Sequence, residues 1–518
     1  MTSDDRASSE FRAGAASLLV DPPLGLPMSG VVLRDKVAGT RVGSLEVSAA
    51  AFDSGGGRVV ICGVDTLAIQ SPEVDELRER VALATGAAPA AVLLNWNHTH
   101  HAPPGGRSVY GSFGESVPEP DDMTLAYVEY LHARVVEVCQ LACERLEPAW
   151  IRWGLGSTDE SMNRRERGPD GMAVFGWNPD GLVDQSVTVL QSLRSDGSAI
   201  ATVVSYGCHT VTTGLGFIGY SPDYPGPLRD LVRSATGGEC VFLQGAGGNI
   251  MPRVAFDESG ESTTHLGRRL ALEALHAVAD RPGWPAELEE TRFRSGTEAR
   301  IFRWNRVAAE QPHIAARATE VDFPLLPLPT PEEITAMREQ SEVEIADAQA
   351  RGATESELRI LRFHGLNWAR RAEREIHSGN PRRSARGSIH AVRIGDGVIV
   401  TAPGEIFTEI GLAVKERSPA DVTLYAGYTN GCISYFPTAQ EYPLGGYEPS
   451  YGNKTYGLPA QVTPECEQIL IDTAVDLVCS LFPEREAPKV PGWLATGALP
   501  APPDPWKVTR PPSRAENS

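Results

Sequence analysis

The sequence predicts an α/β fold in which a mixed sheet is flanked by helices. From about residue 11 to residue 280, apolar runs of strand composition alternate with amphipathic helical segments. "RVVICGVDTLAI" is typical of a buried strand, and "SPEVDELRERVALATG" of a helix with Ser71 at its N-cap and Pro72 at its first position. The runs "AAVLLNWNHTH", "AIATVVSYGCHTV" and "GECVFLQGAGGNI" predict further strands. This alternation is the main observation behind the predicted fold class.

A helical segment interrupts the alternation between about residues 320 and 385. It opens with Thr330 as a predicted cap, followed by Pro331. Strand and helix patterns then return with "SIHAVRIGDGVIVTAPGEIF". Residues 484–518 are rich in proline, which predicts an extended tail. The predicted organisation is one domain over residues 12–483, including the helical insertion, followed by this tail.

Composition and charge exclude several classes of partner. The chain of 518 residues has a formal net charge of −20, which disfavours binding to nucleic acid or to an anionic membrane. No apolar run is long enough to cross a bilayer, and the N-terminus lacks the pattern of a secretory signal. The eight cysteines form no CxxC pair and lie in apolar contexts typical of reduced thiols. We therefore expect a cytoplasmic protein that acts on a small-molecule substrate, and the oligomeric state stays open.

Three histidines stand close together in "LLNWNHTHHAPPGG", at the predicted end of a strand. They are His98, His100 and His101, from a total of 11 histidines in the chain. Because successive strand side chains alternate between faces, His98 and His100 are expected to point the same way. Two imidazoles beside a tight turn suit a metal site, or one ligand with one proton donor. The alternative is a polar surface turn that happens to be rich in histidine.

Other predicted strand ends also deliver polar groups. His209 follows the strand in "VVSYGCHTV", Glu405 lies in the turn of "TAPGEIF", and a glycine-rich turn follows "CVFLQ". Sites in α/β sheets form outside the carboxyl ends of strands, so these groups are expected to converge. Two imidazoles and a carboxylate match a catalytic zinc with an open position. Taken singly, His209 could be a half-buried histidine with satisfied hydrogen bonds, and Glu405 could simply stand at a helix start.

Six short blocks occur in a specific order along the chain. They are "AGAASLLVDPPLGLPMSG", "HTHHAPPGG", "MNRRERG", "CHTV", "APGEIF" and "ISYFPTAQEYPLGGYE". Each block is weak alone, but the ordered set resembles the neutral/alkaline (non-lysosomal) ceramidase family of zinc-dependent amidases. The resemblance covers most of residues 12–480 and concerns the catalytic domain of that family. It implies a ceramidase-like catalytic domain, and the helical segment at about residues 320 to 385 has no counterpart in that resemblance, so we expect it to be an insertion.

The resemblance also implies the roles of individual residues. The implied zinc ligands are His98, His209, Glu405 and Tyr435. The implied residues of the reaction centre are His100, Arg164 and Tyr447. In such an enzyme zinc lowers the pKa of a water that attacks an amide carbonyl, and His100 moves a proton to the leaving nitrogen. Tyr447 or Arg164 would then stabilise the oxyanion as a hydrogen-bond donor.

The sequence departs from the family pattern at one block. The family's Gly-Asp-Val-Ser-Pro appears here as "GGNIMP", with Asn249 in place of the aspartate and Met251 in place of the serine. The thioether of Met251 cannot act as a nucleophile or donor. We therefore expect a zinc-dependent hydrolase that cleaves an amide in a soluble substrate other than a sphingolipid. The alternatives are an ester, lactone, carbamate or glycosidic substrate, or a metal-binding protein without catalysis.

Overall fold

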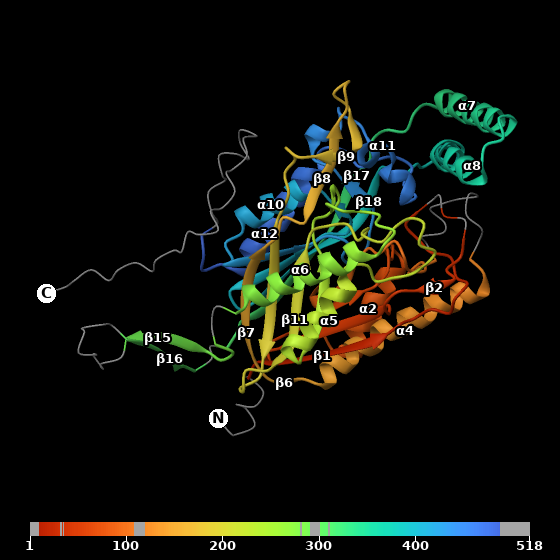
Figure 1. Ribbon diagram of the computed structural model, residues 1–518. Helices are drawn as coiled ribbons and strands as arrows, with labels where there is room; N and C mark the ends of the chain where they lie inside the picture. The colour runs from red at the N-terminus through yellow and green to blue at the C-terminus, as the bar shows by residue number, and fades with distance from the viewer. Residues whose placement is uncertain are drawn as a thin grey trace.

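Three mixed sheets form the centre of the molecule, and helices cover them on the outside (Figure 1). The computed structural model describes residues 10–31, 34, 36–107, 120–279, 282–290, 301–308 and 311–486. The predicted α/β class with a mixed sheet and flanking helices is confirmed, with several sheets in place of one. From residue 487 onward the predicted tail lies outside the described residues.

The first sheet has the strand order β5-β4-β3-β1-β6. Its strands are β1 (Arg12–Leu19), β3 (Glu46–Asp53), β4 (Arg58–Val64), β5 (Val92–Trp96) and β6 (Glu147–Pro148). The parallel neighbours β4 and β5 are joined through α2 (Glu73–Thr85), which packs with α4 (Asp122–Glu144) on the sheet. The predicted cap of α2 is wrong: Pro72, not Ser71, precedes the helix, and no side chain caps it.

The second sheet has the order β13-β11-β10-β7. Its strands are β7 (Trp150–Ser157), β10 (Ser186–Leu193), β11 (Ala199–Tyr206) and β13 (Glu239–Gln244). The parallel pair β11 and β13 is connected through α5 (Pro225–Thr236), and α6 (Glu261–Ala277) packs beside it. Gly154 of β7 permits this approach, because a Cβ there would lie 2.4 Å from the carbonyl oxygen of Ala277.

The third sheet has the order β17-β18-β19-β21. Its strands are β17 (Ile314–Pro324), β18 (Ser384–Ile394), β19 (Gly397–Thr401) and β21 (Val422–Ala426). The parallel pair β19 and β21 is connected through α10 (Thr408–Arg417), which packs on the sheet with α12 (Cys466–Leu481). Each sheet therefore contains one parallel pair with a crossover helix.

The inner faces of the three sheets share one apolar core. Phe52 of the first sheet, Val203 of the second and Ile399 of the third belong to the same buried cluster. At the strand ends the sheets are tied together by a buried amide. Asn95 Nδ2 donates to the carbonyl oxygens of Gln244, at 3.2 Å, and Gly427, at 2.8 Å. The segments that follow the parallel strands therefore meet at one place.

The helical insertion leaves the third sheet after β17 and returns to it at β18. It consists of α7 (Pro331–Ala350), α8 (Glu355–Leu361), the π-helical turn η3 (Arg362–Asn367) and α9 (Trp368–His377). The predicted cap of Thr330 on α7 is confirmed, and it forms a capping box with Glu333. The predicted limits were too wide, because β17 extends to Pro324 and β18 begins at Ser384. In Figure 1 the insertion stands at one corner, beside α11 (Tyr447–Thr455).

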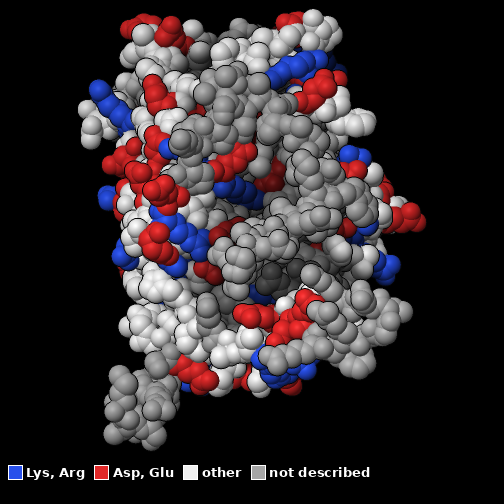
Figure 2. Space-filling model, turned by 90° about the vertical axis from the view of Figure 1, so that its left-hand side faces the viewer, with Lys and Arg blue, Asp and Glu red and all other residues white. Residues whose placement is uncertain are grey.

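Short elements complete the described structure. They are β2 (Thr40–Arg41), β8 (Ser161–Arg167), β9 (Ala173–Asn178), β12 (Gly219–Tyr220), β14 (Ile250–Pro252), β15 (Ala286–Glu290), β16 (Phe302–Arg306), β20 (Glu405–Ile406), β22 (Tyr435–Phe436) and the turns η1 (Pro89–Ala91) and η4 (Ala439–Glu441). Among the described helices none has the length and apolar character needed to cross a membrane. Figure 2 shows acidic and basic side chains interspersed on one face of the molecule.

Candidate active site

His98 and His100 lie beyond the strand that was expected to carry them. Strand β5 ends at Trp96, and His98 has a φ of 66°, in the left-handed region. The alternation of strand side chains therefore does not explain how the two histidines come together. Their rings are nevertheless close, with centroids 5.1 Å apart. The turn after β5 provides the convergence that was predicted from the strand itself.

Backbone carbonyls orient the rings of His98 and His209. Nδ1 of His98 is 2.9 Å from the carbonyl oxygen of Leu67, and Nδ1 of His209 is 2.7 Å from that of Gly247. Because a carbonyl oxygen only accepts hydrogen bonds, each Nδ1 must carry the proton. Nε2 of each ring is then free of a proton and presents its lone pair. This is the tautomer that a metal ligand requires.

Glu405 and Tyr435 meet these two imidazoles. Glu405 Oε2 is 3.4 Å from Nε2 of His98 and 3.0 Å from Nε2 of His209. Strand β20 pairs in parallel with β22, which places Tyr435 beside Glu405, and the Tyr435 hydroxyl is 3.5 Å from Nε2 of His209. All four side chains are buried. The structure thus brings the four predicted ligands to one point.

His100 reaches the same point from the more open side. The ligand atoms of His98, His100 and His209 all lie within 4.8 Å of one another, so this group can hold a metal ion. Nε2 of His100 is enclosed and has no hydrogen-bond partner among the described residues. Imidazole nitrogens with one carboxylate and one phenol oxygen are a donor set that fits zinc. The ring of His100 faces that set.

Burial and neighbouring charges shift the pKa values of this group. Burial, followed by the charge of Arg164, lowers the pKa of His209 to about 4, although Glu405 opposes the shift. Burial alone would raise the pKa of Glu405, but its interactions with His98 and His209 hold that pKa well below its usual value. A neutral imidazole and an ionised carboxylate are the protonation states in which these groups bind metals.

Two further tyrosines hold Glu405 in place. The hydroxyl of Tyr428 donates to Glu405 Oε2 at 3.2 Å, and the hydroxyl of Tyr456 donates to Oε1. Neither residue was predicted. Tyr428 follows β21 by two residues, which is the kind of position that identified His98 after β5, so the signal was present. Tyr456 directly follows α11, and no pattern around it indicates a site residue.

Among solved structures the chain is similar to the neutral ceramidase from Pseudomonas aeruginosa, with a TM-score of 0.64 and 16% sequence identity. The alignment covers 93% of this chain and 77% of that one, and a second structure, of a ceramidase complexed with C2, gives the same values. This chain has a neutral ceramidase-like fold. No known family model matches the sequence, and no curated protein matches it either.

Arg164 reaches the centre of this ceramidase-like fold through Tyr435. Its Nη2 donates to the Tyr435 hydroxyl at 3.2 Å, and its Nε donates to Glu448 Oε1 at 2.8 Å. Arg165 donates to the other oxygen of Glu448 at 2.5 Å, so that one buried carboxylate holds two arginines. Arg164 is therefore placed to position Tyr435, and a role at the oxyanion stays a prediction.

Tyr447 stands at the open side of the site. It is half-buried at the first position of α11, and its ring centroid is 5.6 Å from that of Tyr435. Its hydroxyl is 3.4 Å from Oγ1 of Thr455, about two turns along the same helix. The least buried of the predicted site residues are Tyr447 and His100, which marks the side from which a substrate can approach.

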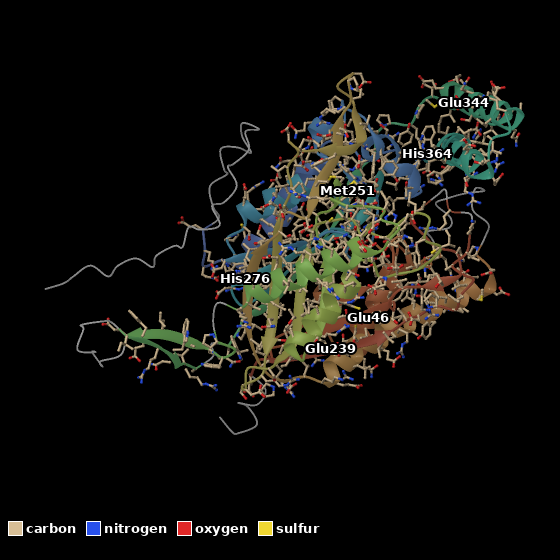
Figure 3. All side chains as sticks on the ribbon, viewed as in Figure 1. Glu46, Glu239, Met251, His276, Glu344 and His364 are labelled. Atoms are coloured by element: carbon tan, nitrogen blue, oxygen red, sulfur yellow. The ribbon has the colours of Figure 1, made fainter. Side chains whose placement is uncertain are left out.

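The two residues that depart from the family block have structural partners. Asn249 Oδ1 accepts the backbone N–H of Thr408 at 2.9 Å, and its Nδ2 donates to Glu409, so Asn249 caps α10. Met251 is buried on β14 and pairs with Met162 of β8 (Figure 3). Asn249 thereby supports the start of α10, and Met251 follows Ile250, whose carbonyl oxygen accepts the backbone N–H of His209 at 3.0 Å.

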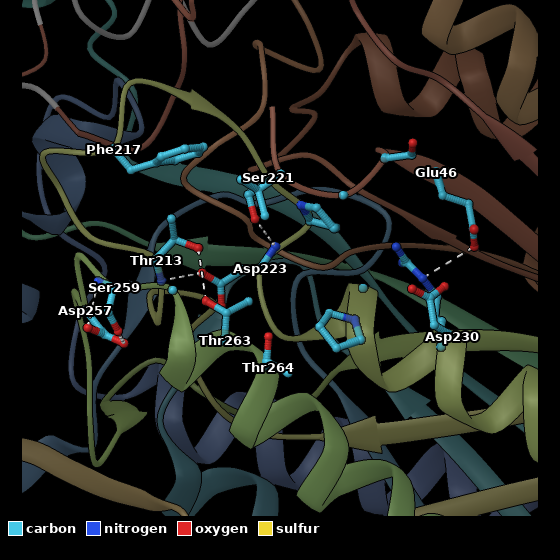
Figure 4. A pocket seen from close by; sticks show the side chains of 18 of the residues that line it. Glu46, Thr213, Phe217, Ser221, Asp223, Asp230, Asp257, Ser259, Thr263 and Thr264 are labelled. Carbon is cyan, nitrogen blue, oxygen red and sulfur yellow. Dashed lines mark hydrogen bonds and ion pairs between the residues drawn. The ribbon is translucent and has the colours of Figure 1, made fainter. Parts of the chain in front are cut away.

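A cavity of about 730 Å³ lies behind the histidine turn and contains none of the predicted ligands (Figure 4). One wall is the segment of Ser221 and Asp223, and Thr99 donates to the carbonyl oxygen of Ser221 at 2.7 Å. In Figure 4 the side chains of Thr213 and Thr263 approach Asp223, which has a φ of 59° and accepts the backbone N–H of Thr213 at 2.8 Å. This cavity therefore lies next to the backbone that shapes the site.

Proposed function

We propose that this protein is a metal-dependent hydrolase that cleaves an amide bond in a soluble substrate other than a sphingolipid, with zinc as the metal. One observation carries the proposal. Nε2 of His98 and Nε2 of His209 both lie within 3.4 Å of a single oxygen of Glu405, while both Nδ1 atoms are bonded to carbonyl oxygens. The likeness to ceramidase structures supports the amide as the bond that is cleaved.

Four residues of this chain would bind the metal, and three others would hold those ligands in position. His98, His209, Glu405 and Tyr435 would hold the metal. When bound, zinc supplies Lewis acidity, which polarises a carbonyl and lowers the pKa of water. The remaining groups set geometry: Tyr428 and Tyr456 hold the carboxylate of Glu405, and Arg164 holds the phenol of Tyr435. A rigid outer layer of this kind maintains ligand orientation.

His100 is the group best placed to move the proton. Water adds its oxygen to the carbonyl carbon, the C–N bond breaks, and a proton of the water ends on the leaving nitrogen. The products are a carboxylic acid and an amine, so the step balances without any further reagent. Nε2 of His100 has no hydrogen-bond partner among the described residues and lies with the other two imidazoles, where it can accept and return that proton.

A soluble substrate fits the charge of the chain. A net charge of −20 repels anionic membrane surfaces, and acidic and basic groups are interspersed on the face in Figure 2. A substrate free in solution avoids that repulsion. We extend the proposal to a cytoplasmic location, because all eight cysteines are free thiols, as is usual in a reducing compartment.

The test compares an N-acyl amide with a p-nitrophenyl ester of the same acyl chain. The metal is removed with a chelator and restored with zinc, and both substrates should lose and regain turnover together. Replacing His100 by alanine should lower amide hydrolysis by about 10²-fold to 10⁴-fold. Ester hydrolysis should fall much less, because p-nitrophenolate leaves without accepting a proton. Ester turnover with no amide turnover in the wild type would instead establish an esterase.

The matched control is His132→Ala. His132 is a buried histidine whose Nε2 lies 2.8 Å from the carbonyl oxygen of Gly105, away from the cluster. It controls for the loss of a buried imidazole as such. If both variants changed the amide and ester rates equally, a proton-transfer role for His100 would be refuted.

A further inference from the structure

Two partly buried cations flank the open side of the site without a carboxylate partner among the described residues. Arg34 donates from Nη1 to the carbonyl oxygen of His100 at 2.7 Å, and its Nε is enclosed without a hydrogen-bond partner. Lys454 donates from Nζ to the carbonyl oxygen of His364 at 2.6 Å. All of these partners are neutral. The positive charges of both side chains are therefore left uncompensated within the described structure.

Arg34 contacts His100, and Lys454 lies about two turns along the helix that begins at Tyr447. Arg34 belongs to a loop that packs against the His100 ring, and Lys454 belongs to α11, which begins at Tyr447. The ring of Tyr451 links the two ends of α11, because its centroid is 6.5 Å from that of Tyr447 and 5.0 Å from Nζ of Lys454. The positive charges thus lie on both sides of the route into the site.

The helical insertion fixes both cations at once. Arg359 of α8 donates to the carbonyl oxygen of Arg34 at 2.7 Å, and Arg371 of α9 lies 3.5 Å from that of Lys454. Figure 3 shows His364, whose carbonyl oxygen binds Lys454, on the part of the insertion nearest the body. The insertion therefore spans from the His100 side to the Tyr447 side and brings additional positive charge to both.

Holding a cation in a poorly solvated place without a counterion is unfavourable. Desolvation lowers the pKa of Lys454 to about 8 and that of Arg34 to about 10, which expresses the same cost. Aromatic faces offset part of it at Lys454, because Nζ lies 5.2 Å from the centre of the Trp368 ring. A bound anion would offset the remaining desolvation cost of both cations in the complex.

We infer that the substrate is an N-acyl amino acid, an amide whose leaving amine carries a carboxylate. This inference rests on the proposed amide hydrolysis. The carboxylate belongs on the amine side, because Arg34 binds the backbone of His100 and His100 serves the leaving nitrogen. Nη1 of Arg34 is occupied by the carbonyl oxygens of Ser29 and His100, so a carboxylate would bind at its Nε edge, and Lys454 adds a second charge at the rim. The helical insertion thereby sets substrate specificity.

The test compares N-hexanoylglycine with N-hexanoylethanolamine, which share an acyl chain and differ in the charge of the amine portion. The wild type should prefer the glycine compound by about tenfold or more in kcat/KM, since a charge-assisted hydrogen bond is worth at least that factor. Arg34→Gln and Lys454→Gln should each reduce this preference, and Arg34→Lys should retain more of it than Arg34→Gln. Arg317→Gln, at an exposed residue of β17, removes one positive charge elsewhere and should leave the preference as it is.

Circular dichroism and metal content verify that each variant is folded and loaded. Equal turnover of both amides by the wild type would overturn this inference and leave the proposed function standing. A preference that survives in both glutamine variants would overturn it as well. Failure of the loaded wild type to cleave either amide, with the matched ester cleaved, would refute the proposed amide hydrolysis itself.

Discussion

Replacing Gly30 by alanine is a sensitive test of the part played by His100. Gly30 has a φ of 92°, and a Cβ built on it would lie 2.7 Å from both Cγ and Nδ1 of the His100 ring. Carbon atoms pack at about 3.5 Å or more, so the ring must move by about 0.8 Å. A displacement of about 1 Å at a catalytic group can cost about 10²-fold in rate. We expect kcat/KM for the amide to fall by about that factor in Gly30→Ala.

The matched control is Gly25→Ala in the same N-terminal segment. Gly25 has a φ of 100°, and its added Cβ would meet only the terminal methyl of Met123, at 4.0 Å. Both substitutions carry the backbone strain of a positive φ, about 1–2 kcal/mol, but only Gly30→Ala displaces the imidazole. Equal kcat/KM in the two variants would refute a role for His100 in the chemistry. Loss of metal in Gly30→Ala alone would instead make His100 a ligand.

The remaining predictions concern the supporting residues. Glu448→Gln should lower the free energy of urea unfolding by about 3–5 kcal/mol, because it uncouples two buried arginines, whereas the exposed Glu129→Gln should cost at most about 1 kcal/mol. Tyr456→Phe should weaken metal binding by about 10-fold to 100-fold in a competition titration with a chelator, since it frees one oxygen of Glu405. Burial lowers the pKa of His390 from 6.5 to about 4, so the unfolded chain binds the proton first. Stability from this residue is present above pH 6.5 and falls by up to about 3 kcal/mol as the pH drops to 4, and His390→Gln should lose less stability over that range. Unchanged values in any of these three measurements would contradict the corresponding argument.

Sequence patterns predicted the fold class because the alternation of strands and helices reflects which faces are buried. They did not predict three separate sheets, since strand pairing over long distances leaves little local trace. Strand β18, for example, pairs with β17 across the whole helical insertion. The ends of the insertion were misplaced for a similar reason, because the middle of β17, residues 317–320, is exposed throughout and does not show the alternation of a half-buried strand.

Site residues could be predicted from their position directly after a buried strand. The expected alternation of side chains along the strand did not predict how their rings come together. His209 and Glu405 were identified because each follows a buried strand, and the structure brings them to within 3.0 Å. His98 was predicted as a site residue from the alternation of strand side chains, but it lies in a turn beyond the strand, where its positive φ orients the ring. Tyr456 and Glu448 could not be found, since they reach the site from α11 and its end, through contacts that no local pattern records.

The most direct test of the metal centre is the zinc content of the purified protein by plasma mass spectrometry. The wild type should hold about one zinc per chain, His209→Ala should lose it, and His132→Ala should retain it. That outcome would show that the cluster of His98, His209 and Glu405 binds the metal. A wild type without zinc after growth in zinc-supplemented medium, or a His209→Ala variant that still holds it, would contradict the account.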